Sequence, residues 1–243
     1  MSEDLQELKS KPVDWAVVLT KGGLGAIPFV GSLLAEVIGN VIPSQRHDRL
    51  ARFLKMLDER LQTVEHETLK ARLAQPEVVD VLEDSFFQAA RAVTEERLEH
   101  VTNVVSNGLS AEQLDTAETK RMLWLLGQLN DAEIIILRGE LTDTIDELDD
   151  EEFRQVHAQL LAPDMTCDGS TEEEFDEAAI KSSYRQHLFD IGLVMYRFQR
   201  PRRDELPEFD PKTGMMKSSG SEVTRLGRMF LSYLKLIPDF LRR

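Results

Sequence analysis

Cysteine and aromatic residues are scarce in this chain of 243 residues, and each scarcity excludes a class of structure. The single cysteine, Cys167, allows neither an internal disulfide nor a cysteine-based zinc site. Cys167 lies in an acidic stretch without a cationic neighbour to stabilise a thiolate, which argues against a catalytic role. Phe, Trp and Tyr make up 7% of the residues, which suits helices packed through Leu, Val and Ala better than a β-sandwich.

Positive charge is also in deficit. Lys and Arg number 29 against 44 Asp and Glu, giving a net charge of −15. Because nucleic-acid binding needs clustered basic residues, nucleic acid is not an expected partner. The N-terminal MSEDLQELKSK lacks the pattern of a signal peptide, so we expect a cytoplasmic protein.

The patterns of common enzyme sites are missing as well. The run from Gly25 to Gly31-Ser32 has neither the spacing nor the Lys of a phosphate-binding loop. No Gly-x-Ser-x-Gly elbow occurs, and the scattered histidines form no His-x3-His or Glu-x-x-His pair. We therefore expect a protein that is not an enzyme and that binds no metal or cofactor.

What the chain does contain is one long stretch almost without charge. Residues 22–42 read GGLGAIPFVGSLLAEVIGNVI, with Glu36 as the only charged residue. Pro28 suits a helix start and Pro43 a helix end, so residues 1–43 are expected to form an apolar, glycine-rich helical hairpin. The residues expected to contact a membrane or a partner are Gly25, Phe29, Val30, Gly31, Leu33, Leu34, Val37 and Ile38.

Two interpretations of this stretch stay open. About 20 apolar residues can span a bilayer, but Pro28 and Glu36 interrupt the run, and a charge at the centre of a spanning helix costs roughly 2.5–3.5 kcal/mol. Membrane entry would therefore be conditional, with Arg46, Arg49 and Arg52 near anionic headgroups. In the other interpretation, the stretch is a buried core around which the helices pack.

Amphipathic spacing predicts helices after residue 43. A first apolar stripe, at spacings of four and three, predicts a long helix over 44–73; its members are Leu50, Leu54, Leu57, Leu61 and Val64. A second stripe predicts an antiparallel partner over 77–106; its members are Val79, Leu82, Phe86, Ala89, Ala90, Val93, Val101 and Val105. Asn107-Gly108 is expected to stop this helix and Ser110 to cap the next, within a domain of residues 44–116.

Residues 117–243 follow a different order. A helical unit over 117–138, with a junction at Asn130-Asp131, precedes an acidic insertion over 140–177. A helix over 178–191, a strand over 193–198, a turn-rich stretch, a returning strand over 221–225 and a helix over 226–236 come next. This is the order of a winged helix, and the expected wing contacts are Arg197, Arg200, Arg202 and Arg203. The predicted fold is thus mainly α, a helical bundle or long antiparallel helix pair with a C-terminal winged-helix-like module.

Three runs carry a family resemblance: AAR…EERLEHVTNVVSNGLS…KRMLWLLGQLNDAEIIIL, YRQHLFDIGLVMY and EVTRLGRMFL. Together they span roughly residues 85–235, and they resemble the Abi-alpha type of bacterial protein, which is linked to abortive infection and phage defence. The chain departs from that pattern at Arg225, where small or turn-forming residues are frequent, and in its acidic insertion. The resemblance implies a defence-associated role and supplies no catalytic residues.

These observations favour a non-enzymatic, abortive-infection-like bacterial defence protein that acts on the membrane through a conditional apolar hairpin. Such a protein is expected in the cytoplasm, peripheral to the inner membrane. The alternative is an adaptor for protein interaction or oligomerisation, with a protein partner or a second copy bound. A weaker alternative is a winged-helix transcriptional regulator.

Overall fold

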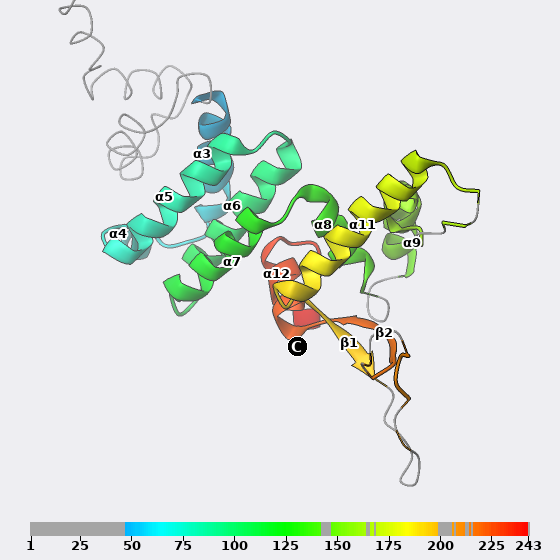
Figure 1. The fold of residues 1–243 in the computed structure, drawn as a ribbon. Coiled ribbons are helices and arrows are strands. Elements are labelled where there is room, and N and C mark those ends of the chain that lie inside the picture. The colour runs from blue at the N-terminus through cyan, green and yellow to red at the C-terminus, as the bar shows by residue number, and fades with distance from the viewer. Residues whose placement is uncertain are drawn as a thin grey trace, which may run out of the picture. The chain divides into compact units, whose positions relative to one another are not determined.

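The computed structural model describes residues 47–141, 147–163, 166–167, 169–198, 206, 208–211, 214 and 216–242. The fold is mainly α, as the sequence predicts, and its described strands form a small two-stranded antiparallel sheet. The chain divides into two compact units, unit 1 (Met1–Gln128) and unit 2 (Leu129–Arg243). The elements of both are labelled in Figure 1. The division falls after Gln128 and not after residue 116, because the helix over 116–128 packs on the helices before it.

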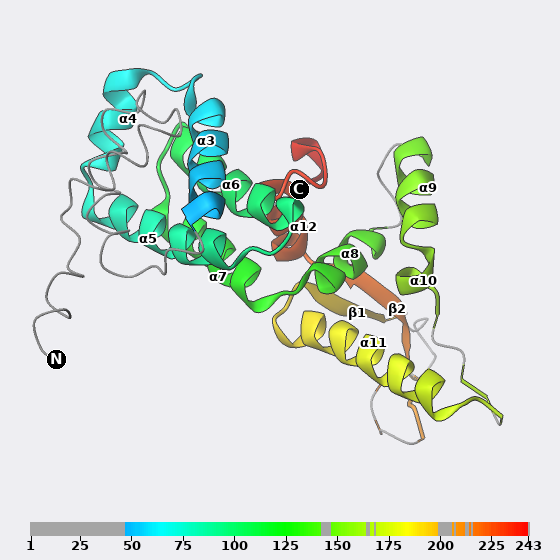
Figure 2. The same cartoon turned by 90° about the horizontal axis from the view of Figure 1, so that it is seen from above.

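Unit 1 is built around one buried helix. Its described elements are α3 (His47–Leu61), α4 (His66–Leu73), α5 (Pro76–Arg91), α6 (Glu95–Ser110) and α7 (Thr116–Gln128). Helix α6 packs against α3, α5 and α7, an arrangement that Figure 2 shows from above. Burial of Val101, Val104 and Val105 in α6 supplies the hydrophobic free energy that short helices need to be stable.

The expected long helices are both broken. The stripe over 44–73 is divided between α3 and α4, and the stripe over 77–106 between α5 and α6. The core residues of the first stripe up to Leu61 are buried, as predicted. Val93, however, is 82% exposed, since it lies in the break before Thr94, whose side chain accepts a hydrogen bond from the Arg97 N–H and caps α6.

The expected helix stop at Asn107-Gly108 is also wrong. Helix α6 continues to Ser110, so Ser110 does not cap the next helix as predicted. Asp115 caps α7 instead, because its side chain accepts a hydrogen bond from the backbone N–H of Glu118. Gly108 serves close packing: a Cβ there would lie 2.3 Å from Thr119 Oγ1 and 2.7 Å from its Cγ2. The absence of a side chain at Gly108 therefore lets α6 and α7 approach each other.

Arginines bind the carbonyl ends of helices from elsewhere in the chain. In unit 1, Arg49 donates to Ala90 O at 3.3 Å, while Arg72 and Arg97 donate to the carbonyls of Leu109 and Leu126. The last four carbonyls of a helix have no partner within it, and the negative end of the helix dipole favours a cation there. These arginine caps therefore both satisfy and neutralise the ends of α5, α6 and α7.

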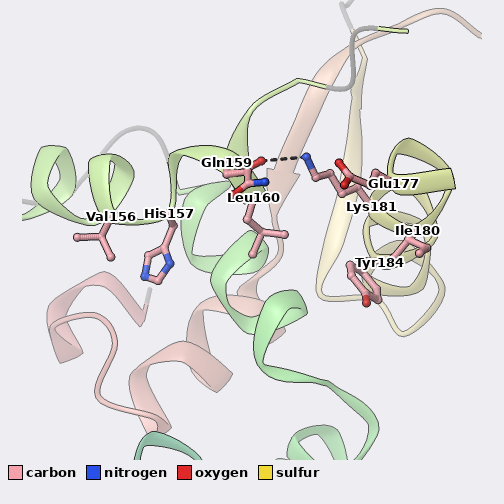
Figure 3. Close-up of a pocket in the computed structure, with 8 residues that line it drawn as sticks. All are labelled: Val156, His157, Gln159, Leu160, Glu177, Ile180, Lys181 and Tyr184. Atoms are coloured by element: carbon pink, nitrogen blue, oxygen red, sulfur yellow. Dashed lines mark hydrogen bonds between the residues drawn. The ribbon is translucent and has the colours of Figure 1, made fainter. Parts of the chain in front are cut away.

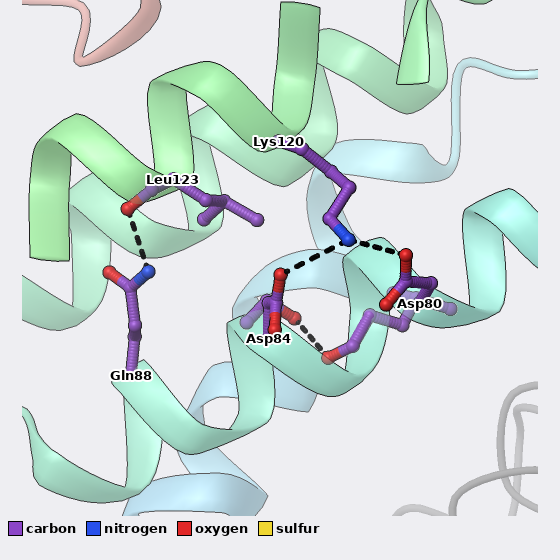
Figure 4. A network of polar contacts seen from close by, with 7 residues as sticks. Asp80, Asp84, Gln88, Lys120 and Leu123 are labelled. Atoms are coloured by element: carbon purple, nitrogen blue, oxygen red, sulfur yellow. Dashed lines mark hydrogen bonds and ion pairs between the residues drawn. The ribbon is translucent and has the colours of Figure 1, made fainter. Parts of the chain in front are cut away.

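Helices α5 and α7 are also joined by polar contacts on the surface. Lys120 of α7 forms an ion pair with Asp80 and lies 3.7 Å from Asp84 of α5 (Figure 4). One turn further, Gln88 Nε2 donates to Leu123 O at 2.7 Å. The hydrogen bond with Asp80, assisted by the charges of both aspartates and opposed by desolvation, raises the pKa of Lys120 above the ordinary value of 10.5.

Unit 2 is organised around a short helix, α8 (Asp131–Gly139). It is followed by α9 (Glu147–Val156), α10 (Ala158–Leu161), α11 (Glu172–Asp190), β1 (Val194–Phe198), β2 (Ser218–Val223), α12 (Arg225–Tyr233) and the 3-10 turn η2 (Asp239–Arg242). Helix α8 packs against α10 and α11. The predicted junction at Asn130-Asp131 is confirmed, because Asn130 caps α8 in a capping box with Glu133.

Polar side chains tie α8 to distant parts of unit 2. Buried Arg138 donates from Nε to Leu236 O at 3.1 Å, and Glu140 accepts a 2.6 Å hydrogen bond from Ser221 of β2. Arg154 of α9 donates to Gly139 O at 3.2 Å and so caps α8. An arginine cap thus recurs in unit 2, and Arg138 and Glu140 connect α8 to residues far along the chain.

The junction between α11, β1 and α12 is fixed by a few residues of the quoted runs. Gly192, at a φ of 78°, ends α11, and Leu193 N–H bonds to Leu188 O as in a Schellman motif. Thr224 caps α12 and its hydroxyl donates to Gly192 O. A Cβ on Gly227 would lie 2.4 Å from Leu193 O, so the strand and α12 meet where only glycine fits.

We expect Gly108→Ala to lower the free energy of unfolding by about 1–3 kcal/mol, since overpacking against buried Thr119 outweighs the gain in helix propensity. Gly127→Ala is the matched control. A Cβ at residue 127 would lie 3.5 Å from the Gln88 side chain, which is an ordinary contact. The substitution should therefore raise the free energy of unfolding by up to about 1 kcal/mol. Urea unfolding measures both, and equal effects would contradict the close approach of α6 and α7.

Lys120→Met should lower stability at neutral pH by at most about 1 kcal/mol, because the pair with Asp80 is exposed and screened. A raised lysine pKa contributes stability below pH 10.5 that is lost as the pH rises through the folded pKa. The difference between wild type and variant should therefore shrink above pH 10.5. Lys55→Met, at a more exposed lysine, serves as the control. If the stability difference between wild type and Lys120→Met instead grows above pH 10.5, the ion pair of Lys120 with Asp80 does not stabilise the fold.

Candidate functional site

Exposed hydrophobic side chains are concentrated in unit 2. Among the described residues, twelve large hydrophobic side chains are exposed, and nine of these belong to unit 2. The nine are Val156, Phe175, Ile180, Met195, Tyr196, Phe198, Leu206, Phe209 and Phe240. Contiguous apolar surface commonly marks a contact with a partner, so the candidate site is sought in unit 2.

A groove of about 420 Å³ lies between α11 and the segment formed by the end of α9 and α10. Its apolar lining comes from Val156, Leu160, Ile180 and Tyr184, and its polar lining from His157, Gln159, Glu177 and Lys181. In Figure 3, Leu160 projects between the two walls and Lys181 reaches across to Gln159. The Lys181 Nζ donates to Gln159 O at 2.9 Å, which links the two walls.

Helix α11 forms one wall because it is capped at its start and attached to other elements further along. Thr171 and Glu174 form a capping box at its start, so the helix begins at Glu172, earlier than the predicted residue 178. Towards its other end, His187 Nδ1 lies 2.7 Å from Glu133 Oε1 of α8, and Leu188 is buried. Arg185 donates to Ala162 O at 3.4 Å and caps α10. Most of α11 is otherwise exposed.

The surroundings of the groove are acidic. Exposed carboxylates follow α11 from its first turn, at Glu172, Glu173, Glu174, Asp176 and Glu177, and α9 adds exposed Glu151 and Glu152. The basic side chains Lys181 and Arg185 are bonded to α10 carbonyls. The groove therefore combines apolar walls with one lining carboxylate, Glu177, and one lining ammonium, Lys181. Further exposed carboxylates continue along α11 towards its start, so the surface suits an apolar protein segment and disfavours phosphate.

The second unusual surface is the β1–β2 hairpin. The strands pair antiparallel with Val194 opposite Val223 and Tyr196 opposite Ser221, which places the predicted strand over 193–198 as expected. Phe189 at the end of α11 stacks on Tyr196 at 4.2 Å, and Tyr196 lies 6.3 Å from Phe198. Met195 is 48% exposed, and Arg197 on the same face of the strand is exposed as well.

The structure describes the position of one of the predicted site residues, Arg197. Arg197 lies on β1, in the predicted wing, whereas Arg200, Arg202 and Arg203 fall outside the described residues. The residues of the apolar stretch over 22–42 also fall outside; those predicted to make contacts are Gly25, Phe29, Val30, Gly31, Leu33, Leu34, Val37 and Ile38. Sequence reasoning missed the groove, although the spacing of Ile180 and Tyr184 on one helix face signals it.

Within the described ranges, His, Cys, Asp and Glu side chains form no group of three that could hold a metal ion. Cys167 is exposed and its Sγ lies 3.9 Å from Ser170 Oγ. Of the helices that the structure describes, none combines the length and apolar character needed to cross a membrane.

Comparison with known proteins returns no match, either to a family model, to a curated protein or to a solved structure. The resemblance to the Abi-alpha type stays a prediction.

Glu133→Ala should destabilise unit 2 by about 2–3 kcal/mol, because it removes the acceptor for both Asn130 N–H and His187 in a buried position. Hydrogen exchange should show faster exchange in both α8 and α11. Glu174→Ala removes the same capping-box position from exposed α11 and should cost about 0.5–1 kcal/mol. Equal losses for the two variants would show that the contact with His187 contributes nothing.

Proposed function

We propose that this protein is a non-enzymatic component of an abortive-infection-like bacterial defence and that it acts by binding protein through unit 2. The observation that carries the proposal is the concentration of exposed apolar side chains at the groove and the hairpin. Burying such side chains against a partner gains free energy in proportion to the apolar area removed from water. In unit 1, only three large hydrophobic side chains among the described residues are exposed.

The chemistry of the groove favours a protein partner over other classes. Its apolar lining from Ile180 and Tyr184 suits side chains, and aromatic residues such as those of β1 are enriched in protein interfaces. The carboxylates along α11 disfavour a nucleic-acid or anionic headgroup partner at this surface. The defence context comes from the family resemblance of roughly residues 85–235.

Site-specific photo-cross-linking in bacteria that express the full chain tests the proposal. A photoreactive amino acid at Ile180 or Tyr196 should give cross-linked protein products, because both positions lie on the exposed apolar surface of unit 2. The same group at Val93, which is more exposed but belongs to unit 1, is the matched control. Phage plating should show that Ile180→Glu reduces protection.

Products at Val93 as abundant as those at Ile180 would contradict the proposal, since they would indicate collisions without a specific surface. Absence of products at both unit 2 positions would contradict it as well. Mass spectrometry of the product identifies the partner and separates a foreign protein from a second copy of this chain.

A second candidate function is membrane action, favoured by one observation: residues 22–42 contain a single charged residue. The protein should then co-sediment with anionic liposomes, and Gly31→Glu or Leu34→Glu should abolish binding and leakage without lowering the thermal unfolding temperature. Leakage unaffected by either substitution would contradict membrane action. If the same substitutions collapse stability, the stretch is core, and the proposal based on unit 2 is unaffected.

A further inference from the structure

Helices α9 and α10 differ from the rest of unit 2 in how little of them is buried. From Glu151 to Pro163, every residue is exposed or half-buried. Helix α8, by contrast, buries Ile134, Ile136 and Leu137. Because buried apolar side chains supply most of the stability of a fold, a segment that buries none of its own opens at a lower free energy than the elements beside it.

We propose that α9 and α10 together form a flap that detaches and unfolds while α8 and α11 stay folded. The flap supplies one wall of the groove. Its opening would therefore convert the groove into an open face of α11, on which Ile180 and Tyr184 are accessible. The inference goes beyond the proposed function and does not depend on it, since the opening is a property of unit 2 alone.

Half-buried side chains attach the flap to α8, beside which Figure 2 shows it. Arg154 donates to Gly139 O at 3.2 Å, and Arg138 Cζ lies 4.8 Å from the centre of the Phe153 ring. Leu161 packs on Gly139 so closely that a Cβ at residue 139 would lie 2.5 Å from Leu161 Cδ2. Phe153, Arg154 and Leu161 all keep part of their surface in water, which limits the stability that these contacts contribute.

Towards α11, the flap is held by hydrogen bonds across the groove. Lys181 Nζ donates to Gln159 O at 2.9 Å, as Figure 3 shows, and Arg185 donates to Ala162 O at 3.4 Å. Between these contacts lies the groove of about 420 Å³. Opening on this side therefore breaks polar contacts and widens a space that side chains already leave open.

A detached flap would lose its helical structure. Helix α9 has 10 residues and α10 has 4, and isolated helices of this length are marginal in water. The backbone bonds are local, because His157 N–H donates to Phe153 O and Ala162 N–H donates to Ala158 O. These amides therefore exchange with solvent when the flap detaches, and they report its opening.

Native-state hydrogen exchange of the full chain, measured by NMR at several urea concentrations below the unfolding transition, tests the inference. The protection factors of His157, Leu160 and Ala162 should be at least about tenfold lower than that of Ile134 in α8. They should also depend less on urea, because a local opening exposes little surface. Equal protection and equal urea dependence in the flap and in α8 would overturn the inference.

A disulfide between residues 139 and 161 should hold the flap closed. A Cβ at Gly139 would lie 3.4 Å from Leu161 Cγ, which brings the two Cβ atoms near the separation of roughly 3.5–4.5 Å that a disulfide requires. In a Cys167→Ser background, oxidation of the Gly139→Cys/Leu161→Cys variant should raise the protection factors of Leu160 and Ala162 at least about tenfold. The reduced form of the same variant is the matched control. Protection unchanged by oxidation would show that these amides exchange without detachment from α8.

Loosening the flap should have the opposite effect. Lys181→Met removes the hydrogen bond to Gln159 O and keeps an apolar stem, so the protection factors in the flap should fall about two- to tenfold, with α8 unchanged. Gln186→Met is the matched control on the same helix, because Gln186 is exposed and bonds to Asp190 within α11. If Lys181→Met lowers protection equally in the flap and in α8, the two open as one unit and the inference is wrong.

Discussion

The ends of short helices impose the constraint on which this structure depends. Each helix leaves its last carbonyls without internal partners, and in helices as short as α8 and α10 those carbonyls are a large share of the backbone. The chain meets this need with arginines from other elements: Arg97 binds the end of α7, Arg154 the end of α8 and Arg185 the end of α10. Each such contact satisfies an acceptor and fastens one helix to another.

In unit 2, the side chains that satisfy the ends of α8 also attach this helix to other elements. Its first turn carries Glu133, which caps the helix through Asn130 and holds α11 through His187. Its last turn carries Arg138, which reaches Leu236. Helix capping and tertiary attachment thus use the same side chains, so α11 is held while most of its surface stays exposed. The groove lies where α11 is attached to α8 through His187 and to the α10 segment through Lys181 and Arg185, while its first turns stay exposed.

Local signals predicted much of the fold. The spacing of Leu50, Leu54 and Leu57 identified a buried face, and Asn130-Asp131 marked a helix start that the structure confirms. The break before α6 was missed because no glycine or proline marks it; Thr94 followed by two glutamates was the available signal. The groove could not be predicted in full, because Lys181 bonds to the backbone of Gln159, and a carbonyl that accepts a distant side chain carries no mark in the sequence. The apolar stretch over 22–42 lies outside the described residues, and its role stays a prediction.

The sequence distances of these contacts differ between the units, and this bears on how the chain folds as it is synthesised. In unit 1, Arg49 and Arg72 bind carbonyls 41 and 37 residues away, so α5 and α6 can acquire their caps while unit 2 is still being made. In unit 2, Ser221 binds Glu140 across 81 residues and Arg138 binds Leu236 across 98. Since local contacts form fastest and domains fold in order from the ribosome, the attachment of α8 through Arg138 must wait for residue 236. A nascent chain would therefore carry a folded unit 1 before the hydrogen bond from Arg138 to Leu236 is made.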